Sequence, residues 1–397
     1  MIRRCFAARG ESPPSHRGGR CARRMQADFH HGLLGSVAVG VLLTVLALAT
    51  VPVAGQAPAP AKANGPAAKA YTPPKTADGQ PDLSGYWTNS TYIPLQRPKG
   101  VTKEFYTPEE MDKMEAAAKA REDEQTVPGT QSDVHYDDGQ FGLARSQSTY
   151  ARNLRTSLIV DPPDGRIPPQ TEAAVRRNDS ITKARTVGTP PPGFTANDIR
   201  GGNLDSVHGI KIDTRCLMMA AVPPPLVSPG YLANYQIIQS PGYVTILVER
   251  LHDARIIPLD NRPFPSASVR SWVGVSRGHW EGTTLVVETR NSNGRVQAAA
   301  QGPMTGQTFA GATEDMKITE RFTRVSADRI DYRFTVEDPK TWTRAWTAEV
   351  PFERMNPQGP FFEHACYEGN YSIANMLTNA RVLEKRAAEA AAKKGSN

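Results

Sequence analysis

The stretch KITERFTRVSADRIDYRFTVEDPKTWTRAWTAEVPF, residues 317–352, decides the fold. Apolar and polar residues alternate along it, which is the period of a β-strand with one buried face. The turns Ser-Ala-Asp and Asp-Pro-Lys divide it into three runs, so it predicts three antiparallel strands. Two sets of residues are expected on buried faces: Tyr332, Phe334 and Val336 in the second run, and Trp342, Trp346, Ala348, Val350 and Phe352 in the third.

Similar runs precede this stretch. Ser-Pro-Gly at 240–242 separates two of them and predicts a β-hairpin. Runs joined mostly by short turns indicate a mainly β protein, whose antiparallel meander forms a barrel or a strongly bent sheet. The expected strands are Tyr235–Gln239, Tyr243–Glu249, Arg255–Leu259, Ser271–Ser276, Thr284–Thr289, Lys317–Val325, Ile330–Glu337 and Trp342–Phe352.

Helices are expected at both ends of this β core. Thr107, followed by Pro108 and then by Glu110, forms a capping box that predicts a helix to about Glu124. Pro-rich loops follow over 161–192, interrupted by a short helix at about Thr171–Ala184. A C-terminal helix begins at about Ser372, and its apolar stripe comprises Ile373, Met376, Leu377, Ala380 and Leu383.

The N-terminal residues have the composition of a secretory signal. Seven Arg precede an apolar segment, Leu33–Val53, and small residues follow it up to a cleavage site near Ala57. An uncleaved membrane anchor is the alternative, because the apolar segment is long enough to span a bilayer. The prediction is a periplasmic or secreted protein whose only membrane contact is through this signal, if it stays uncleaved.

The expected domain organisation follows from composition. Residues 1–57 are the signal peptide, 58–80 a disordered Pro/Ala-rich linker, 81–385 a single β-rich domain, and 386–397 a charged tail. Within the domain, 81–200 wraps around the β core at 201–371, and 372–385 is the helix. Removing the signal lowers the net charge from +7 to +2. We therefore expect no nucleic-acid partner.

Six ordered segments resemble a family of uncharacterised exported proteins of environmental bacteria. They are PDLSGYW at 81–87, SLIVDPPDGRIPP at 157–169, YQIIQSPGYVTILVERLHDARIIPLD at 235–260, GHWEGTTLVVET at 278–289, TERFTRVSADRIDYRFTVEDPKTWTRAWTAEVPF at 319–352 and HACYEGNY at 364–371. The resemblance implies export and no particular activity or cofactor. The family pattern has Arg, Asp and His where this chain has His279, Thr283 and Phe264, so we assign these three positions no catalytic role.

A shorter likeness concerns the barrel. Gly85-Tyr86-Trp87 is similar to the Gly-x-Trp start of lipocalin-type barrels, in which the Trp plugs one end of the barrel.

The best candidate for chemistry is Leu251-His252-Asp253-Ala254-Arg255. Here His252 is a candidate acid/base, Asp253 a group that orients it, and Arg255 a holder of an anionic group. The alternative is a polar hairpin corner in which Asp253 and Arg255 form a salt bridge. We also name His364 or Glu368 as a second catalytic partner.

The C-terminal candidates surround a cysteine. In a strand, His364, Cys366 and Glu368 would project from one face and suit a zinc-like ion, although this spacing is no standard zinc signature. We therefore predict no metal site and no cofactor. Cys216 and Cys366 remain after signal removal and are either disulfide-bonded or two buried thiols.

The expected ligand-binding residues lie near these cysteines and in one turn. A disulfide would bring Arg215 close to His364 and Glu368, and together with His252 and His208 these residues would line the mouth of the barrel. Tyr367 is a further expected ligand-binding residue. Trp280 lies in the predicted turn Gly278–Gly282 and is the most exposed tryptophan expected.

Two functions follow from these residues. The first is an exported small-molecule-binding protein of unknown ligand with a β-barrel-like core. The alternative is a periplasmic hydrolase or lyase that acts on a small organic substrate. The two functions differ in one geometric requirement. Only the enzyme requires that His252, Arg255, His364 and Glu368 converge on one pocket.

Overall fold

The computed structural model describes residues 71–122, 149–185, 214–219, 222, 224–228, 232–294, 309, 312–356 and 361–395. The predicted signal peptide, most of the linker and His208 lie outside these residues. No helix in the described ranges combines the length and the apolar character needed to cross a bilayer.

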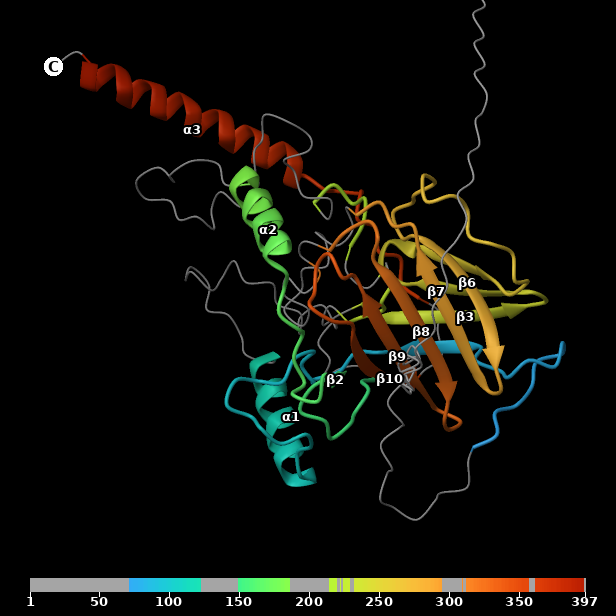
Figure 1. The fold of residues 1–397 in the computed structure, drawn as a ribbon. Coiled ribbons are helices and arrows are strands. Elements are labelled where there is room, and N and C mark those ends of the chain that lie inside the picture. The colour runs from blue at the N-terminus through green and yellow to red at the C-terminus, as the bar shows by residue number, and fades with distance from the viewer. Residues whose placement is uncertain are drawn as a thin grey trace, which may run out of the picture. The chain divides into compact units, whose positions relative to one another are not determined.

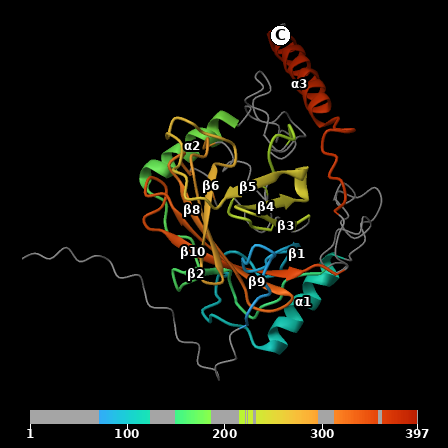
Figure 2. The same cartoon turned by 90° about the vertical axis from the view of Figure 1, so that its right-hand side faces the viewer.

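The predicted β fold is confirmed. Nine strands form one antiparallel sheet in the order β5-β4-β3-β1-β10-β9-β8-β7-β6, and β2 pairs with β10 beside β1. Figures 1 and 2 show the sheet curling round into a nearly closed barrel. The strands are β1 (Gly85–Thr88), β2 (Ile159–Asp161), β3 (Asn234–Ser240), β4 (Tyr243–Val248), β5 (Ala254–Pro258), β6 (Val275–Glu281), β7 (Thr284–Arg290), β8 (Lys317–Arg324), β9 (Arg329–Glu337) and β10 (Trp346–Arg354).

The two edge strands of the sheet, β5 and β6, lie alongside each other without forming a ladder. They run in the same direction, because nine alternating strands place the first and the last parallel. Gly278 of β6 lets them approach. A Cβ atom there would lie 2.8 Å from Ile257 Cγ2 and 2.9 Å from Leu259 Cδ2, closer than carbon atoms pack. Side chains, rather than backbone hydrogen bonds, therefore close this seam.

A buried ion pair also crosses the seam. Arg255 of β5 donates from Nη1 to Glu320 Oε1 at 2.9 Å, and its Nη2 also contacts Glu320 Oε2. The same guanidinium donates to Ser276 Oγ of β6 at 2.9 Å and to Thr289 Oγ1 of β7 at 2.8 Å. Tyr332 of β9 donates to Glu320 Oε1 at 2.8 Å. One arginine thus links β5 directly to β6, β7 and β8.

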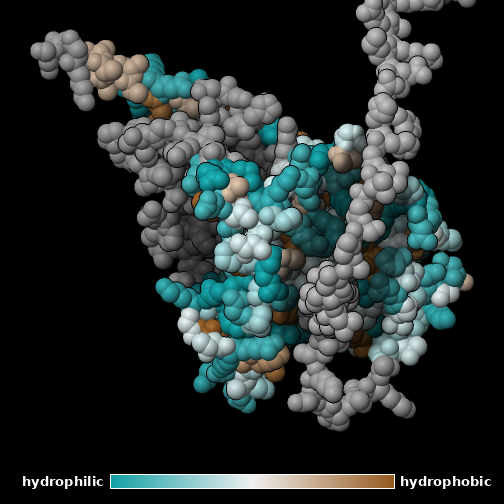
Figure 3. Space-filling model, viewed as in Figure 1, coloured by the Kyte–Doolittle hydropathy of each residue, from teal (hydrophilic) through white to brown (hydrophobic). Residues whose placement is uncertain are grey.

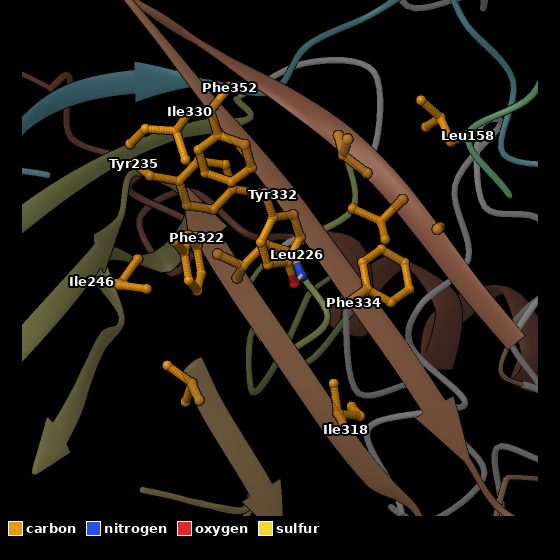
Figure 4. Close-up of a cluster of buried hydrophobic side chains, with 14 of the residues drawn as sticks. Leu158, Leu226, Tyr235, Ile246, Ile318, Phe322, Ile330, Tyr332, Phe334 and Phe352 are labelled. Atoms are coloured by element: carbon orange, nitrogen blue, oxygen red, sulfur yellow. Dashed lines mark hydrogen bonds between the residues drawn. The ribbon is translucent and has the colours of Figure 1, made fainter. Parts of the chain in front are cut away.

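Aromatic side chains fill the space next to this network. Tyr332 packs against Phe322 and Phe352, with ring centroids 4.7 Å and 5.2 Å apart. Leu226, from a segment outside the strands, enters the same cluster, and its backbone N–H donates to the Tyr332 hydroxyl at 2.9 Å (Figure 4). Burying these large side chains contributes to the hydrophobic stabilisation of the sheet.

Trp87 is covered by charged side chains. It is fully buried, and its indole N–H donates to the Leu83 carbonyl at 2.9 Å. The guanidinium groups of Arg324 and Arg354 lie 5.6 Å and 4.7 Å from its ring centroid. Arg324 also donates to the Asp82 carbonyl at 2.8 Å, which ties the start of the folded chain to β8. Cation–π contacts and hydrogen bonds thus hold Trp87 in place.

The three predicted helices are present as α1 (Pro108–Glu122), α2 (Glu172–Arg185) and α3 (Ser372–Gly395). The predicted capping box is confirmed at α1. Thr107 N–H donates to Glu110 Oε2 at 2.8 Å, and Glu110 N–H donates to Thr107 Oγ1 at 3.2 Å.

Three strand assignments differ from the structure. β6 begins at Val275, so the predicted strand Ser271–Ser276 is largely loop, and the predicted turn Gly278–Gly282 is mostly strand. β10 begins at Trp346 and excludes Trp342, although both side chains are buried. β1 was not expected as a strand, because four residues are too few to show a period.

The buried ion pair between Arg255 and Glu320 leads to a prediction about the free energy of unfolding. Arg255→Met leaves the Glu320 carboxylate, which is 0% exposed, without its cation. Leaving a buried charge unpaired costs about 3–5 kcal/mol of unfolding free energy. We expect this loss in urea unfolding, and a partial recovery in the double variant Arg255→Met, Glu320→Gln.

Arg262→Met is the matched control, because Arg262 also pairs with a carboxylate, Asp260, but at the surface. Its urea midpoint should stay at the native value. A single Arg255→Met variant as stable as the native chain would contradict the prediction.

Candidate functional site

A strained corner connects β4 to β5. The short 3-10 helix η4 (Arg250–His252) contains Leu251 and His252 with φ angles of 61° and 52°. This left-handed region is unfavourable for residues other than glycine, and such strain concentrates at functional sites. The Val248 N–H donates to the Asp253 carbonyl at 2.9 Å and closes the corner. As a result, the His252 side chain is exposed.

Residues 361–370, which we call the strap, lie against this corner. The disulfide between Cys216 and Cys366 is present, so the predicted bridge is confirmed. The Tyr367 hydroxyl donates to the Cys216 carbonyl at 2.7 Å, and Asn370 Nδ2 donates to the Thr214 carbonyl at 3.0 Å. The strap is thus attached covalently and by hydrogen bonds to the segment around Cys216.

Each histidine ring accepts a backbone hydrogen bond from the segment that carries the other histidine. The His364 N–H donates to His252 Nε2 at 3.1 Å, and the Leu251 N–H donates to His364 Nδ1 at 3.4 Å. These residues are 112 positions apart in the sequence, so only the fold brings them together.

Each backbone donor selects one tautomer of its histidine. A ring nitrogen that accepts a hydrogen bond carries no proton, so the other nitrogen of a neutral ring is an N–H donor. His252 Nδ1 and His364 Nε2 are therefore donors. Within the described ranges, neither nitrogen has an acceptor. Burial and the charges of Arg250 and His252 lower the pKa of His364 below its usual value, which favours its neutral form.

Glu249 attaches the strap to β3. Its side chain is 3% exposed, and its Oε2 accepts from Asn234 Nδ2 at 2.7 Å. Its Oε1 accepts from the Phe362 N–H at 3.3 Å. Burial raises the pKa of Glu249 above its usual range. The carboxylate thus holds β3 and the strap together.

The predicted catalytic residues do not all meet. His252 and His364 come together, but Arg255 points into the barrel and pairs with Glu320. The expected alternative, a salt bridge between Asp253 and Arg255, is therefore wrong. Asp253 is oriented toward the Ala254 N–H, and burial raises its pKa. Glu368 is exposed on the strap. The arrangement required for the predicted hydrolase or lyase is not assembled.

The considered zinc-like arrangement is also not present. Residues 361–371 form bends and a turn instead of a strand, so His364, Cys366 and Glu368 do not share a strand face. The disulfide removes the thiolate of Cys366 as a ligand. In the part of the chain that the structure describes, no three His, Cys, Asp or Glu side chains are placed to hold a metal ion.

The predicted ligand-binding residues are divided. Arg215 is half-buried beside Cys216, and Tyr367 is 66% exposed on the strap. Trp280 was expected to be exposed in a turn, but it lies in β6 and packs half-buried against the core. The prediction failed because β6 continues to Glu281, so the turn begins only at Gly282, whose φ is 60°. His208 lies outside the described residues.

Several residues of the site were not anticipated. Two exposed aromatic rings accompany the predicted Tyr367: Phe362 on the strap is 83% exposed, and Tyr371, which follows the strap, is 71% exposed. Glu249 was missed because it resembles the polar end of a strand. The signal that could have found Glu320 is its place in the row Ile318, Glu320 and Phe322, where a charge interrupts an otherwise apolar face.

No family model, curated protein or solved structure matches this chain.

The surroundings of His364 lead to a prediction about the pKa of its ring. The His364 ring should titrate below pH 6.5, because burial and the positive charge of Arg250, joined by His252 when that ring is protonated, disfavour its charged form. The unfolded chain binds this proton at higher pH than the folded chain does. The contribution of His364 to folding is therefore fully present above pH 6.5 and declines as the pH falls toward the folded pKa.

NMR of the imidazole protons measures this pKa. His252→Gln keeps an acceptor for the His364 N–H and removes one titrating neighbour, so the His364 pKa should rise toward 6.5. A native midpoint at or above 6.5 would show that the ring is not held neutral.

Proposed function

We propose that this protein is an exported binding protein for a small organic molecule, held at the corner formed by η4 and the strap. The observation that carries this proposal is the pair of backbone-to-imidazole hydrogen bonds. They turn His252 Nδ1 and His364 Nε2 into hydrogen-bond donors at the surface of a barrel-like core.

The donors define the chemistry of the ligand. A carboxylate or carbonyl oxygen accepts from neutral imidazole N–H groups, and Arg215, the residue before the disulfide-bonded Cys216, is a nearby cation in the sequence that would favour an anion. The exposed rings of Phe362 and Tyr367 offer flat apolar faces on which an aromatic or similarly flat ligand stacks. We therefore propose an aromatic carboxylate as the ligand class.

Binding accounts for the site better than catalysis does. A histidine acts as a general base through an unprotonated nitrogen, and in both rings that nitrogen already accepts from a backbone N–H. Using either ring as a base would first break the bond that attaches the strap to the corner. As a donor, each ring keeps that bond.

The test is a titration of the full mature chain with benzoate, in which the ¹⁵N chemical shifts of the histidine rings are measured at each benzoate concentration. Benzoate should shift His252 and His364. His364→Ala or His252→Ala should weaken binding about tenfold, the value of one hydrogen bond of about 1.4 kcal/mol.

His279→Ala is the matched control, because His279 is also exposed but lies on β6 and pairs with Glu281. It should bind benzoate as the native chain does. Equal benzoate affinity in His252→Ala, His364→Ala and His279→Ala would overturn the proposed site.

Export is part of the proposal. The basic, apolar and small-residue order of residues 1–57 supports it, as does the resemblance to exported bacterial proteins. The Cys216–Cys366 disulfide also supports it, because such bonds persist in oxidising compartments.

Expression in a Gram-negative host tests export. Intact-mass measurement of the periplasmic protein should show a chain that begins near residue 58 and is two mass units lighter than its reduced form. A full-length chain found only in the cytoplasm would contradict the proposal.

A further inference from the structure

The C-terminal helix α3 presents an apolar row that the described chain does not bury. None of its side chains from Ser372 to Lys393 is buried, although the helix is 24 residues long. Ile373, Met376 and Leu383 of this row are partly exposed, and Leu377 and Val382 beside the row are 36% and 41% exposed. Apolar and charged residues of α3 are both visible at the surface (Figure 3, viewed as in Figure 1). A long helix with an uncovered apolar row requires a partner for that row.

The spacing of the row is that of a helix pair. Apolar residues recur at alternating intervals of three and four, which is the heptad pattern that buries one narrow seam between two helices. This row comprises Ile373, Met376, Ala380, Leu383, Ala387 and Ala390.

The row fits a second copy of itself in the opposite direction. An antiparallel pair places Ile373 against Ala390 of the second copy and Met376 against Ala387 of the second copy. Ala380 then faces Leu383 of the second copy. Each layer matches one large side chain with one alanine, so the seam fills evenly. A parallel pair would place large against large at one end and leave only alanines at the other.

Charge favours the same direction. Residues 372–380 carry no charge, whereas 381–395 contain five basic and two acidic residues. A parallel pair sets the two basic halves side by side, where like charges repel. An antiparallel pair sets each basic half against an uncharged one. An anionic membrane surface fits less well, because the second half of the row offers only alanines to a bilayer.

We propose that α3 is a self-association helix, through which two copies of this chain pair antiparallel along the row from Ile373 to Ala390. The pairing is two-fold symmetric and uses the same surface on both copies, as in most homodimers. This inference is independent of the proposed ligand site.

Sedimentation of the full mature chain tests the pairing. The native chain should form dimers, and Leu383→Glu should weaken the dimer at least tenfold, because it places a carboxylate in the seam. Val382→Glu is the matched control, since it places the same carboxylate on the adjacent residue, which lies outside the row. It should leave the dimer affinity within about threefold.

Both variants should keep the native far-UV circular dichroism, which would show that the helix stays folded when the dimer is weakened. A native chain that stays monomeric at about 100 μM overturns the proposal, since a Kd above this value is too weak for a helix that serves to pair two chains. Sedimentation with vesicles of phosphatidylcholine and phosphatidylglycerol, without self-association, would assign α3 to a membrane surface and also overturn it.

Cross-linking tests the direction. In an antiparallel pair, the double variant Ile373→Cys, Ala390→Cys forms intermolecular disulfides, whereas Ile373→Cys alone does not. Efficient cross-linking of the single variant would show a parallel pair and contradict the proposed direction.

Discussion

The rest of the structure depends on the buried ion pair between Arg255 and Glu320. A barrel of nine alternating strands ends with two strands that run in the same direction, and here those strands share no backbone ladder. Arg255 spans this seam with hydrogen bonds to Ser276, Thr289 and Glu320. Because the guanidinium has five donors in a rigid fork, one side chain can bind three strands at once.

This arrangement also explains why Arg255 does not join the site at the surface. Desolvating a cation is costly unless its donors are satisfied, and Glu320 and two hydroxyl groups satisfy them inside the barrel. His252, three residues earlier, lies on the strained corner before β5 begins and faces outward instead. Neighbouring residues thus have unrelated roles, one in closing the barrel and one in the candidate site.

The candidate site combines local strain with a long-range attachment. Left-handed backbone at Leu251 and His252 sets the direction of the first histidine, and the disulfide holds the strap that carries the second. Glu249, which directly precedes the corner, accepts hydrogen bonds from the strap and from β3. The imidazoles are consequently positioned by other groups, namely the strained backbone, the disulfide and Glu249, which is the kind of support that preorganises a site.

The sequence by itself determined the features that depend on local periodicity. Alternation predicted the buried faces of β9 and β10, Ser-Pro-Gly predicted the β3–β4 hairpin, and Thr107 with Glu110 predicted the start of α1. Only the tertiary structure decided the partner of Arg255, the meeting of His252 with His364 and the half-buried state of Trp280. The physical reason is that period and capping act over a few residues, whereas these contacts depend on strand order, seam closure and a disulfide across 150 residues.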